Sequence, residues 1–427
     1  MTAFFWWCVE NIYELVCVVF VIFYKNSSLT ILRITSDLSR GCAYFVSLSF
    51  DFFFFLTQKM HRDDSIYFST KKLMICVECG NPIFSFLCRF NSLHFICDLS
   101  CGMIPIISLK SLLTKSKDAV IDDEIGRACM DIGFFIVVDH GVPKDLQLQL
   151  ETSTKRFFAL PRTEKNKIHM KHALKAWRGY FSVGEELTSS IVDEKEGIYF
   201  GSETPEDKRP LHGSNLYLNK DLARVVPIYM EHMTRLGRII LKSIARFLKV
   251  TSEFEHQFER PTTLFRAFHY PPHDPKFGSN VFGVGEHTDY GYLTILKTDN
   301  VGGLQVKMNG RWSDVKYVEN GFVINLGDAL EHNTQGLLRA TPHRVIQRKN
   351  TTRSRYSWPF FFDPNFDTEM INVKLPPSLE SIARKRREDE PSRWDGKDPK
   401  KFRGTYGRYL MEKVSKVFPE LARKSKL

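Results

Sequence analysis

The pattern of hydrophobic and polar positions becomes regular at Ile104 and stays so for most of the remaining chain. Apolar residues there recur in short runs that are separated by polar turns, and the period of each run predicts a helix or a strand. The predicted elements are a strand at 104–109, a helix at 122–130 with acidic residues in its first turn, an apolar strand at 133–143, a helix at 144–160, and loops with short strands at 173–218.

The longest helical pattern covers residues 219–250. Pro227 is expected to kink this helix or to lie in its first turn. Apolar residues three and four apart form one stripe, which is more typical of core packing than of a binding site. The stripe consists of Tyr229, Met233, Leu236, Ile240, Ile244 and Phe247.

From Leu264 the period changes to short alternating runs broken by Gly, Pro and Asn. Six to eight short strands are expected, and such a series favours a sandwich or a barrel. Helices followed by an antiparallel β core give an α+β class. Beyond Asp363 we expect a charged segment at 384–390 and a last helix at 406–421.

The first hundred residues follow a different pattern. Residues 1–102 hold eight of the nine cysteines, have no sustained period, and carry as many acidic as basic side chains. Residues 4–24 form an apolar stretch of membrane-spanning length, but Glu10 and Glu14 interrupt it, and charges are costly in a bilayer. Cys76 and Cys79 have the spacing of a zinc knuckle, although the partner spacing of Cys97 and Cys101 is unusual for zinc. We expect residues 1–102 to be an over-extended translation start, with the natural protein beginning at Met103.

The chain has 427 residues and a net charge of +11, and all of the excess positive charge lies beyond residue 102. A basic excess can indicate a nucleic-acid partner. No basic recognition helix, zinc-finger spacing or aromatic RNA-binding motif accompanies it, so no nucleic-acid partner is expected. The basic run at 384–387 is predicted to be a solvated surface.

The stretch GEHTDYGYLTIL, residues 285–296, contains two residues with metal-binding side chains. His287 and Asp289 are two apart, so on a strand they point to the same side, roughly 7 Å apart at the Cα atoms. His343 begins another alternating run and is the candidate third ligand. Two histidines and one carboxylate on one face suit non-haem Fe(II) and oxygen. The H-x-D at His61 has no such partners.

A second pair of polar residues follows in RYSWPFFF, where Arg355 and Ser357 again share one strand face. A guanidinium group together with a hydroxyl fits a carboxylate. The predicted site therefore combines a metal centre with an anion clamp. A keto acid that chelates the metal and ends in a second carboxylate would use both.

With these residues in place, the region from about Ile104 to Phe366 resembles the 2-oxoglutarate- and Fe(II)-dependent dioxygenases of the isopenicillin N synthase-like, plant-type family. GFFIVVDHGVP and the series EHTDYGYLTIL, GGLQV, FVINLGD, HRV and RYSWPFFF carry the resemblance. It implies a double-stranded β-helix, or jelly roll, with flanking helices and an N-terminal α/β subdomain. It also implies that His287, Asp289 and His343 bind iron.

The resemblance further implies that Arg355 and Ser357 hold the distal carboxylate of 2-oxoglutarate, with Tyr270 as a third contact or a plain core residue. Three positions depart from the family pattern. Asp139 and Phe268 each stand where asparagine is more usual, and the longer hairpin before Arg355 offers Arg353 as a second arginine. Arg355 is preferred because Tyr356, Ser357 and the aromatic residues that follow fix the register.

The expected activity is oxidation, with hydroxylation as the favoured outcome, of a small organic substrate by an Fe(II)-, O2- and 2-oxoglutarate-dependent enzyme, with ascorbate as a further cofactor candidate. Two alternatives stay open: an Fe(II) oxidase of the isopenicillin N synthase or 1-aminocyclopropane-1-carboxylate oxidase kind that uses no 2-oxoglutarate, and a catalytically idle binding module. The substrate pocket is expected near residues 178–180, 199–200, 211–217 and 360–362.

The chain is accordingly divided into five parts. These are an uncertain extension at 1–102, an N-terminal subdomain at 103–218, a buttressing helix at 219–258, a catalytic domain at 259–367, and a charged C-terminal segment with a helix at 368–427. A monomer is expected.

The last three residues, Ser425, Lys426 and Leu427, match a peroxisomal address that the import receptor reads. We therefore expect a peroxisomal or cytoplasmic protein, with membrane anchoring through residues 4–24 as the alternative. A fluorescent fusion with a free C-terminus should gather in peroxisomes. Deletion of the three residues should make the signal diffuse, and an unchanged distribution would contradict the expectation.

Overall fold

The structure is a computed structural model, and it divides the chain into two compact units, Met1–Cys101 and Gly102–Leu427. In the first unit it describes five strands, and in the second it describes residues 104–417, without 189–190, 273–281, 347–351 and 390–402, together with Arg423. No helix within these described parts is long and apolar enough to cross a membrane. The three C-terminal residues of the expected peroxisomal address lie outside them.

The first unit contains two small antiparallel sheets. One is the pair β1 and β2, and the other has the order β3-β4-β5. Residues 16–24 of the expected membrane stretch are therefore strand, and its residues 4–15 lie outside the described residues. Cys79, Cys97 and Cys101 of the zinc alternative also lie outside them. The bounds are Val16–Lys25 (β1), Ser28–Asp37 (β2), Ile66–Ser69 (β3), Lys72–Val77 (β4) and Phe84–Arg89 (β5).

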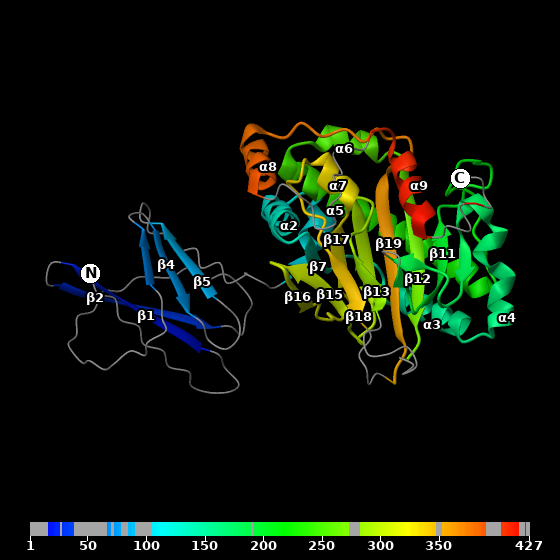
Figure 1. The fold of residues 1–427 in the computed structure, drawn as a ribbon, viewed down its shortest axis with the longest axis horizontal. Coiled ribbons are helices and arrows are strands. Elements are labelled where there is room, and N and C mark those ends of the chain that lie inside the picture. Colours follow the sequence, from blue (N-terminus) through cyan, green and yellow to red (C-terminus); the bar gives the residue numbers. More distant parts are fainter. Residues whose placement is uncertain are drawn as a thin grey trace. The chain divides into compact units, whose positions relative to one another are not determined.

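The second unit is built around an eight-stranded sheet with the order β6-β7-β17-β14-β19-β12-β11-β8 (Figure 1). The β6–β7 pair is parallel and the other neighbours are antiparallel. The bounds are Ile106–Ser108 (β6), Phe134–Val138 (β7), Gly179–Phe181 (β8), Glu196–Gly201 (β11), Pro261–Tyr270 (β12), Leu293–Thr298 (β14), Phe322–Leu326 (β17) and Arg355–Asn365 (β19).

A four-stranded sheet with the order β13-β18-β15-β16 packs against the larger one. The Phe134 ring on β7 lies edge to face with the His343 ring, at a centroid distance of 5.3 Å. From β12 to β19 the chain passes back and forth between the two sheets, so residues far apart in sequence meet between them. The bounds are Phe282–His287 (β13), Leu304–Met308 (β15), Arg311–Asp314 (β16) and His343–Ile346 (β18), and a separate hairpin joins Leu187–Thr188 (β9) to Ile191–Val192 (β10).

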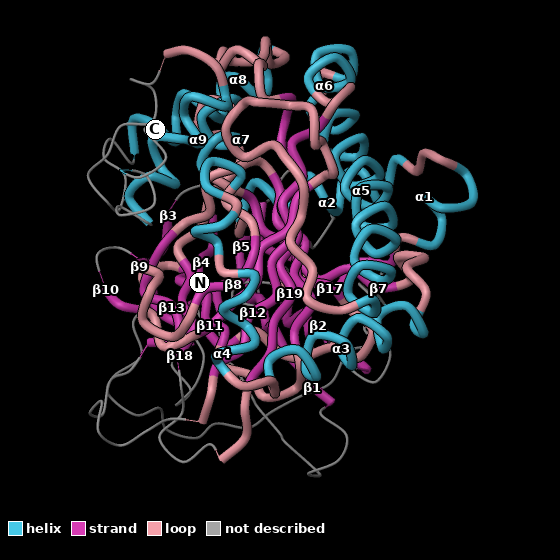
Figure 2. Tube along the Cα trace, turned by 90° about the vertical axis from the view of Figure 1, so that its right-hand side faces the viewer, coloured by secondary structure: helices cyan, strands magenta, loops and turns pink. Residues whose placement is uncertain are grey.

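Three long helices cover the face of the large sheet that is turned away from β13 and β18 (Figure 2). They are Ala119–Asp131 (α2), Lys144–Phe158 (α3) and Lys220–Leu248 (α5). Asn219 caps α5 by accepting a hydrogen bond from the Leu222 amide at 2.9 Å, as expected for a side-chain cap. Pro227 lies inside α5 rather than in its first turn.

Helices α2 and α5 are joined by a partly buried ion pair. Asp122, which was expected only to favour the start of its helix, accepts hydrogen bonds from Arg246 at 2.7 Å through Nε and Nη2 and from Ser243 at 2.6 Å. The start of α2 is capped by Asp118 instead, three residues earlier than predicted. The apolar stripe of α5 is confirmed as core, with Phe247 partly buried beside it.

The shorter helices were not predicted as such, because a few turns carry too little period to be recognised. They are Lys110–Lys115 (α1), Arg162–Lys165 (α4), Thr251–Gln257 (α6) and Asp328–Asn333 (α7), with single 3-10 turns at Asn166–Ile168, Met170–His172 and Leu174–Ala176. Helix α9, Tyr406–Val417, corresponds to the predicted last helix.

The charged segment near residue 384 is a helix, Pro377–Asp389 (α8), and its basic run is only partly solvated. Arg386 donates hydrogen bonds to the carbonyls of Met130 at 2.7 Å and Leu337 at 2.6 Å, and Arg387 donates to the carbonyl of Gln335 at 2.7 Å. The prediction of a solvated run is confirmed for Arg384 and Lys385, which are exposed, but is wrong for Arg386 and Arg387, which donate to carbonyl groups of neighbouring segments.

We expect Arg386→Met to lower the free energy of unfolding by about 1–3 kcal/mol, since it removes the donor from two partly buried carbonyl groups. Urea unfolding followed by circular dichroism measures this change. The neighbouring Lys385 is exposed, and Lys385→Met is the matched control with an expected change below about 0.5 kcal/mol. Equal effects of the two substitutions would contradict the role of Arg386.

Candidate metal centre

Two histidines from different parts of the chain face each other across neighbouring strands of the smaller sheet. His287 is the last residue of β13 and His343 the first of β18, and the two are paired in the strand register. Asp289 lies two residues beyond the end of β13, in the turn that leads to β14, rather than on the strand itself. The turn brings its carboxylate back beside both imidazole rings.

These three side chains offer ligand atoms that all lie within 4.8 Å of one another. Asp289 Oδ1 is 3.7 Å from His287 Nε2 and 3.7 Å from His343 Nε2. The two imidazole centroids are 4.2 Å apart. This group of two nitrogens and one oxygen is suited to a non-haem iron ion with positions left open on one side.

Backbone carbonyls orient both imidazole rings. His287 Nδ1 lies 2.8 Å from the carbonyl oxygen of Gly285, and His343 Nδ1 lies 3.1 Å from that of Thr341. A carbonyl can only accept a hydrogen bond, so each Nδ1 carries the proton and each Nε2 keeps its lone pair for a metal. Such partners typically fix the tautomer of a metal-binding histidine.

Two neutral side chains fix the Asp289 carboxylate. Thr294 Oγ1 and Asn325 Nδ2 donate hydrogen bonds to its Oδ2 at 2.5 and 2.6 Å, which leaves Oδ1 turned toward the histidines. Thr294 lies on β14 and Asn325 opposite it on β17. Neither residue was predicted from the sequence. Asn325, a lone amide inside the apolar run FVINL, is the signal that could have identified the pair.

Burial and charge set the ionisation of the group. Burial lowers the pKa of the His343 imidazole to about 4, helped by the nearby His287. Burial alone would raise the pKa of the Asp289 carboxyl, but the two histidines and the hydrogen bonds from Thr294 and Asn325 hold it below its usual value. At neutral pH the site therefore offers a neutral His343 and an ionised carboxylate, the forms that bind metal.

We expect Asn325→Ala to weaken iron binding by about 10- to 100-fold, because the Asp289 carboxylate loses one of its two orienting donors. Competition between the protein and a coloured chelator measures the change. Asn300, whose amide oxygen accepts a hydrogen bond from the exposed Arg353 at 3.0 Å, offers a control substitution of the same chemistry. Asn300→Ala is expected to leave the affinity unchanged, and an equal loss in both variants would contradict the assignment.

Arg355 is buried at the start of β19, with 5% of its surface exposed. Its Nε donates to the carbonyl oxygen of Gly302 at 2.8 Å, while its buried Nη1 has no hydrogen-bond partner. A buried guanidinium nitrogen without a partner is costly, and a carboxylate would satisfy it. Arg353, the alternative arginine, is exposed. The residues therefore fit the distal carboxylate of a dicarboxylic keto acid.

Tyr270 and Ser357 lie beside Arg355 as the sequence analysis expected. Tyr270 pairs with Arg355 in the register of β12 and β19, and the guanidinium carbon lies 4.8 Å from the centre of its ring. Ser357 is buried two residues further along β19 on the same face. It pairs with Phe268, the residue that stands where asparagine is more usual. Phe268 is buried and packs against aromatic neighbours.

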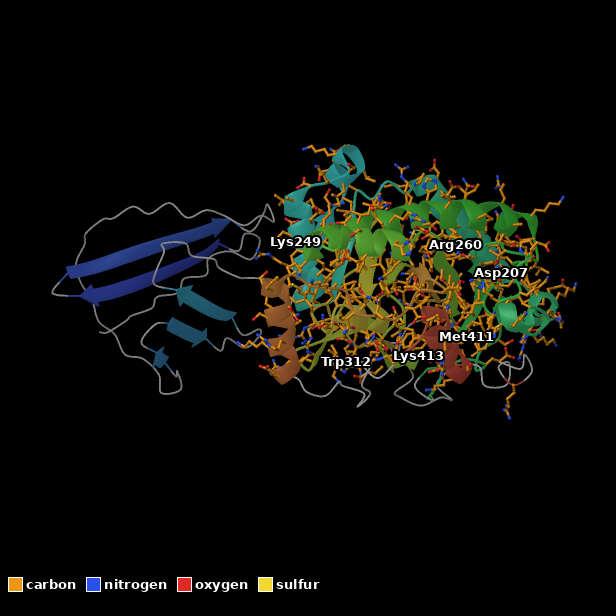
Figure 3. The ribbon with its side chains drawn as sticks, turned by 90° about the horizontal axis from the view of Figure 1, so that it is seen from above. Asp207, Lys249, Arg260, Trp312, Met411 and Lys413 are labelled. Carbon is orange, nitrogen blue, oxygen red and sulfur yellow. The ribbon has the colours of Figure 1, made fainter. Side chains whose placement is uncertain are left out.

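Helix α9 lies beside the turn that carries Asp289. Lys413 on α9 (Figure 3) lies over the Tyr290 ring at 5.3 Å and forms an ion pair with Asp328 at 3.2 Å. The Asp328 amide in turn donates to the carbonyl oxygen of Asp289 at 2.8 Å. The C-terminal helix therefore helps to hold the backbone of a candidate metal ligand.

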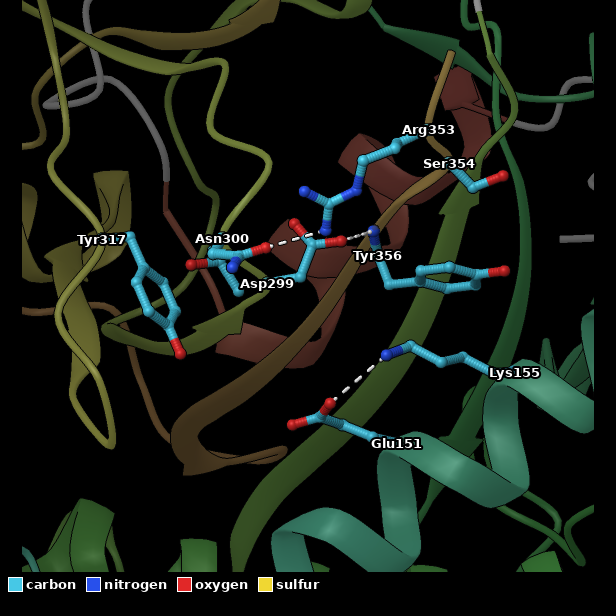
Figure 4. Close-up of a pocket in the computed structure, with 9 residues that line it drawn as sticks. Glu151, Lys155, Asp299, Asn300, Tyr317, Arg353, Ser354 and Tyr356 are labelled. Atoms are coloured by element: carbon cyan, nitrogen blue, oxygen red, sulfur yellow. Dashed lines mark hydrogen bonds and ion pairs between the residues drawn. The ribbon is translucent and has the colours of Figure 1, made fainter. Parts of the chain in front are cut away.

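A polar cavity of about 420 Å³ lies near this region but on the other face of β19 (Figure 4). Tyr356, which lines it, alternates with Arg355 and Ser357 along the strand, so its side chain points to the opposite side. The cavity is separate from the metal ligands. It is lined by Glu151, Lys155, Thr298, Asp299, Asn300, Tyr317, Arg353, Ser354 and Tyr356.

Parts of the expected substrate pocket are packed core. Phe360 and Phe362 are fully buried, and the Phe362 ring stacks on Phe258 at 5.2 Å, so the expectation for these two residues is wrong. Their aromatic character suggested a pocket, but the period of β19 turns them away from the metal ligands. Arg178 is also buried, where it donates to the carbonyls of Ser202 at 2.8 Å and Leu211 at 3.2 Å.

Two family models match the chain. Residues 104–220 match the N-terminal domain of the non-haem dioxygenases in morphine synthesis, and residues 261–364 match the 2OG-Fe(II) oxygenase superfamily. The second match covers all three candidate metal ligands as well as Tyr270, Arg355 and Ser357.

Among curated proteins, the chain is similar to one from Dictyostelium discoideum named a probable iron/ascorbate oxidoreductase. The two are 38% identical over 358 residues, which cover 76% of this chain and 97% of that protein. A 1-aminocyclopropane-1-carboxylate oxidase from Dictyostelium mucoroides is 32% identical over 357 residues, or 74% of this chain and 95% of its own length.

Among solved structures, the chain is similar in fold to a full-length protein from Neurospora crassa that was solved in complex with alpha-KG and 5-formyluracil. The TM-score is 0.60 at 22% identity, and the match covers 74% of this chain and 96% of the Neurospora protein. At this identity the likeness concerns the fold alone.

Proposed function

Because the chain belongs to the 2-oxoglutarate- and Fe(II)-dependent oxygenase superfamily and is an oxidoreductase of the dioxygenase type, we propose that it hydroxylates a small organic substrate. The reaction consumes one O2 and one 2-oxoglutarate for each substrate and yields the hydroxylated product, succinate and CO2. The observation that carries this proposal is the group of His287, Asp289 and His343 within 4.8 Å, close in the fold to a buried arginine with an unused donor.

Iron is held in this proposal by Nε2 of His287, Oδ1 of Asp289 and Nε2 of His343. Their partners already orient all three atoms toward one point, so little rearrangement is needed to bind the metal. The bound iron and 2-oxoglutarate supply the oxidising chemistry. The protein contributes the position of each reactant and the exclusion of water.

2-Oxoglutarate is proposed to bind with its distal carboxylate at Arg355. The unused Nη1 and the Ser357 hydroxyl provide donors, and Tyr270 packs on the guanidinium group at 4.8 Å and keeps it in place. The keto acid end of the molecule would then reach the open side of the metal group. Arg355 thereby sets the direction in which the co-substrate lies.

The two packed sheets are proposed to form the double-stranded β-helix that the sequence resemblance implies. The alternation of β12 to β19 between an eight-stranded and a four-stranded sheet supports this interpretation. In this arrangement the metal ligands lie at the open end of the smaller sheet, and the clamp lies on the larger one. The site is assembled only where both sheets meet.

The proposal is tested by adding Fe(II) and 2-oxoglutarate to the purified full chain and measuring O2 uptake, succinate and CO2. One succinate for each O2 consumed is expected, with slow turnover in the absence of substrate. O2 uptake without succinate would instead indicate the alternative that uses no 2-oxoglutarate, which the 32% identity to a 1-aminocyclopropane-1-carboxylate oxidase supports. A chain that binds no iron would indicate a binding module.

A further inference from the structure

A group of charged side chains lies against β12, where Lys195 Nζ is 5.0 Å from the centre of the Phe268 ring, and it takes no part in the proposed binding of iron or 2-oxoglutarate. Lys195 Nζ lies 2.7 Å from Glu186 Oε2 and also forms an ion pair with Asp193. The Tyr199 hydroxyl donates a hydrogen bond to Glu186. Burial would raise the pKa of the Glu186 carboxyl, but Lys195 and Arg266 hold it below its usual value. Lys195 thus forms ion pairs with two carboxylates.

Arg266 is the member of this group whose donors remain unused. Its Nη1 is 4.0 Å from Glu186 Oε1, beyond hydrogen-bond distance, and its Nε is buried without a partner. The guanidinium carbon lies 4.1 Å from the centre of the Tyr199 ring and 4.7 Å from that of Phe361, so two aromatic rings flank it. The Arg266 side chain is 20% exposed, whereas that of Glu186 is 4% exposed. Arg266 is therefore held in place yet still accessible.

The strand register places Arg266 near the metal ligands. Thr294, which donates a hydrogen bond to Asp289, pairs with Phe361 on β19. Phe361 in turn pairs with Leu264 on β12, and Leu264 lies two residues before Arg266. Neighbouring strands are about 4.8 Å apart, so the β12 backbone lies about 10 Å from Thr294 across the sheet. A small molecule at the metal can therefore reach Arg266.

We propose that Arg266 binds a carboxylate of the substrate, so that the enzyme acts on small carboxylic acids. This inference rests on the proposed function and names the class of its substrate. A planar carboxylate can accept two parallel hydrogen bonds from a guanidinium group. Lys195 and Arg266 together offset the charges of Glu186 and Asp193, so the group has no net charge and accommodates a ligand with one negative charge more readily than a doubly charged phosphate. The rings of Tyr199 and Phe361 suit the carbon skeleton of the acid.

Arg266 and Arg355 have separate tasks in this arrangement. Both lie on the same face of the large sheet, but Arg355 pairs with Tyr270, which is four residues beyond Arg266 on β12. Two arginines on neighbouring strands, at different places on one face of the sheet, can hold two carboxylates at once. One carboxylate belongs to 2-oxoglutarate and the other to the substrate, and the metal lies within reach of both.

The test is a calorimetric titration of the full chain with a panel of small carboxylic and amino acids and the primary amide of each. Titrations are run with iron alone and with iron plus 2-oxoglutarate, without oxygen. Acids should bind, and their amides should bind roughly 100-fold more weakly, because an amide leaves the partly buried guanidinium poorly paired. Arg266→Gln should lower the affinity for the acids by a similar factor, and Arg266→Lys should retain part of that affinity.

Arg260→Gln is the control, since Arg260 is exposed directly before the same strand, and it should bind acids as the unaltered chain does. Iron content and 2-oxoglutarate affinity of Arg266→Gln should stay unchanged, which also shows that the variant is folded. The inference is wrong if amides bind as tightly as acids or if no acid of the panel binds. It is equally wrong if Arg266→Gln binds the acids with the affinity of the unaltered chain. It is also wrong if Arg266→Gln lowers the affinity for 2-oxoglutarate and leaves the affinity for the acids unchanged. Absence of succinate with normal acid binding would contradict only the proposed function.

Discussion

His287→Ala is expected to abolish iron binding and turnover. The substitution removes one of the three ligand atoms that lie within 4.8 Å of one another and leaves two, which is too few to hold Fe(II) against water and buffer. The loss of affinity should exceed the roughly 100-fold that follows removal of an orienting partner. Metal analysis after desalting and succinate formation from 2-oxoglutarate measure both effects.

The matched control is His256→Ala. The His256 side chain is 85% exposed on α6, so its loss tests whether the removal of any histidine lowers activity. The control should keep the iron content and rate of the unaltered chain. If His287→Ala decarboxylates 2-oxoglutarate at the unaltered rate, the assignment of the metal centre is wrong.

Arg355→Gln should raise the 2-oxoglutarate KM by about 30-fold or more, with the iron content unchanged. Truncation of one partner of a buried, hydrogen-bonded charge pair costs about 2–5 kcal/mol, and the distal carboxylate would lose its charged partner here. Initial rates of succinate formation over a range of 2-oxoglutarate concentrations provide the measurement. A lower affinity for iron would instead indicate a structural role.

The neighbouring arginine provides a control within the same segment. Arg353 lies two residues before Arg355 but is exposed and donates a hydrogen bond to Asn300 at 3.0 Å. Arg353→Gln should leave the KM for 2-oxoglutarate within about twofold. A large rise in that variant and none in Arg355→Gln would mean that the clamp is the other arginine.

The fold could be predicted from sequence wherever an element was long and its period clear. The stripe of α5 and the apolar strand β7 are examples, since each shows its period over several positions. Helix α8 could not be recognised because its sequence is dominated by charge and, among its side chains of described burial, only Ala383 is fully buried. Its stability depends on Arg386 and the carbonyl oxygens of Met130 and Leu337, which come from distant parts of the chain.

The candidate metal ligands could be predicted because three residues of suitable chemistry occur at suitable spacing. Their partners could not, since Thr294 and Asn325 become neighbours of Asp289 only through the pairing of β14 with β17. For the same reason the proximity of Arg266 and Glu186 could not be predicted, since Arg266 lies on β12 and Glu186 lies in the segment before β9. Contacts across strands carry no signal in the linear order of residues.

The pairing of β7 with β17 has a consequence for synthesis of the protein. The apolar segment Phe134–Val138 emerges from the ribosome long before its partner Phe322–Leu326 exists. At about 5–20 residues per second, the delay is on the order of ten seconds or longer. Strand β6 can cover only one edge of β7, so the other edge stays open and is a template for aggregation during that interval. The nascent chain should therefore depend on chaperones until the segment that carries Asn325 has been translated.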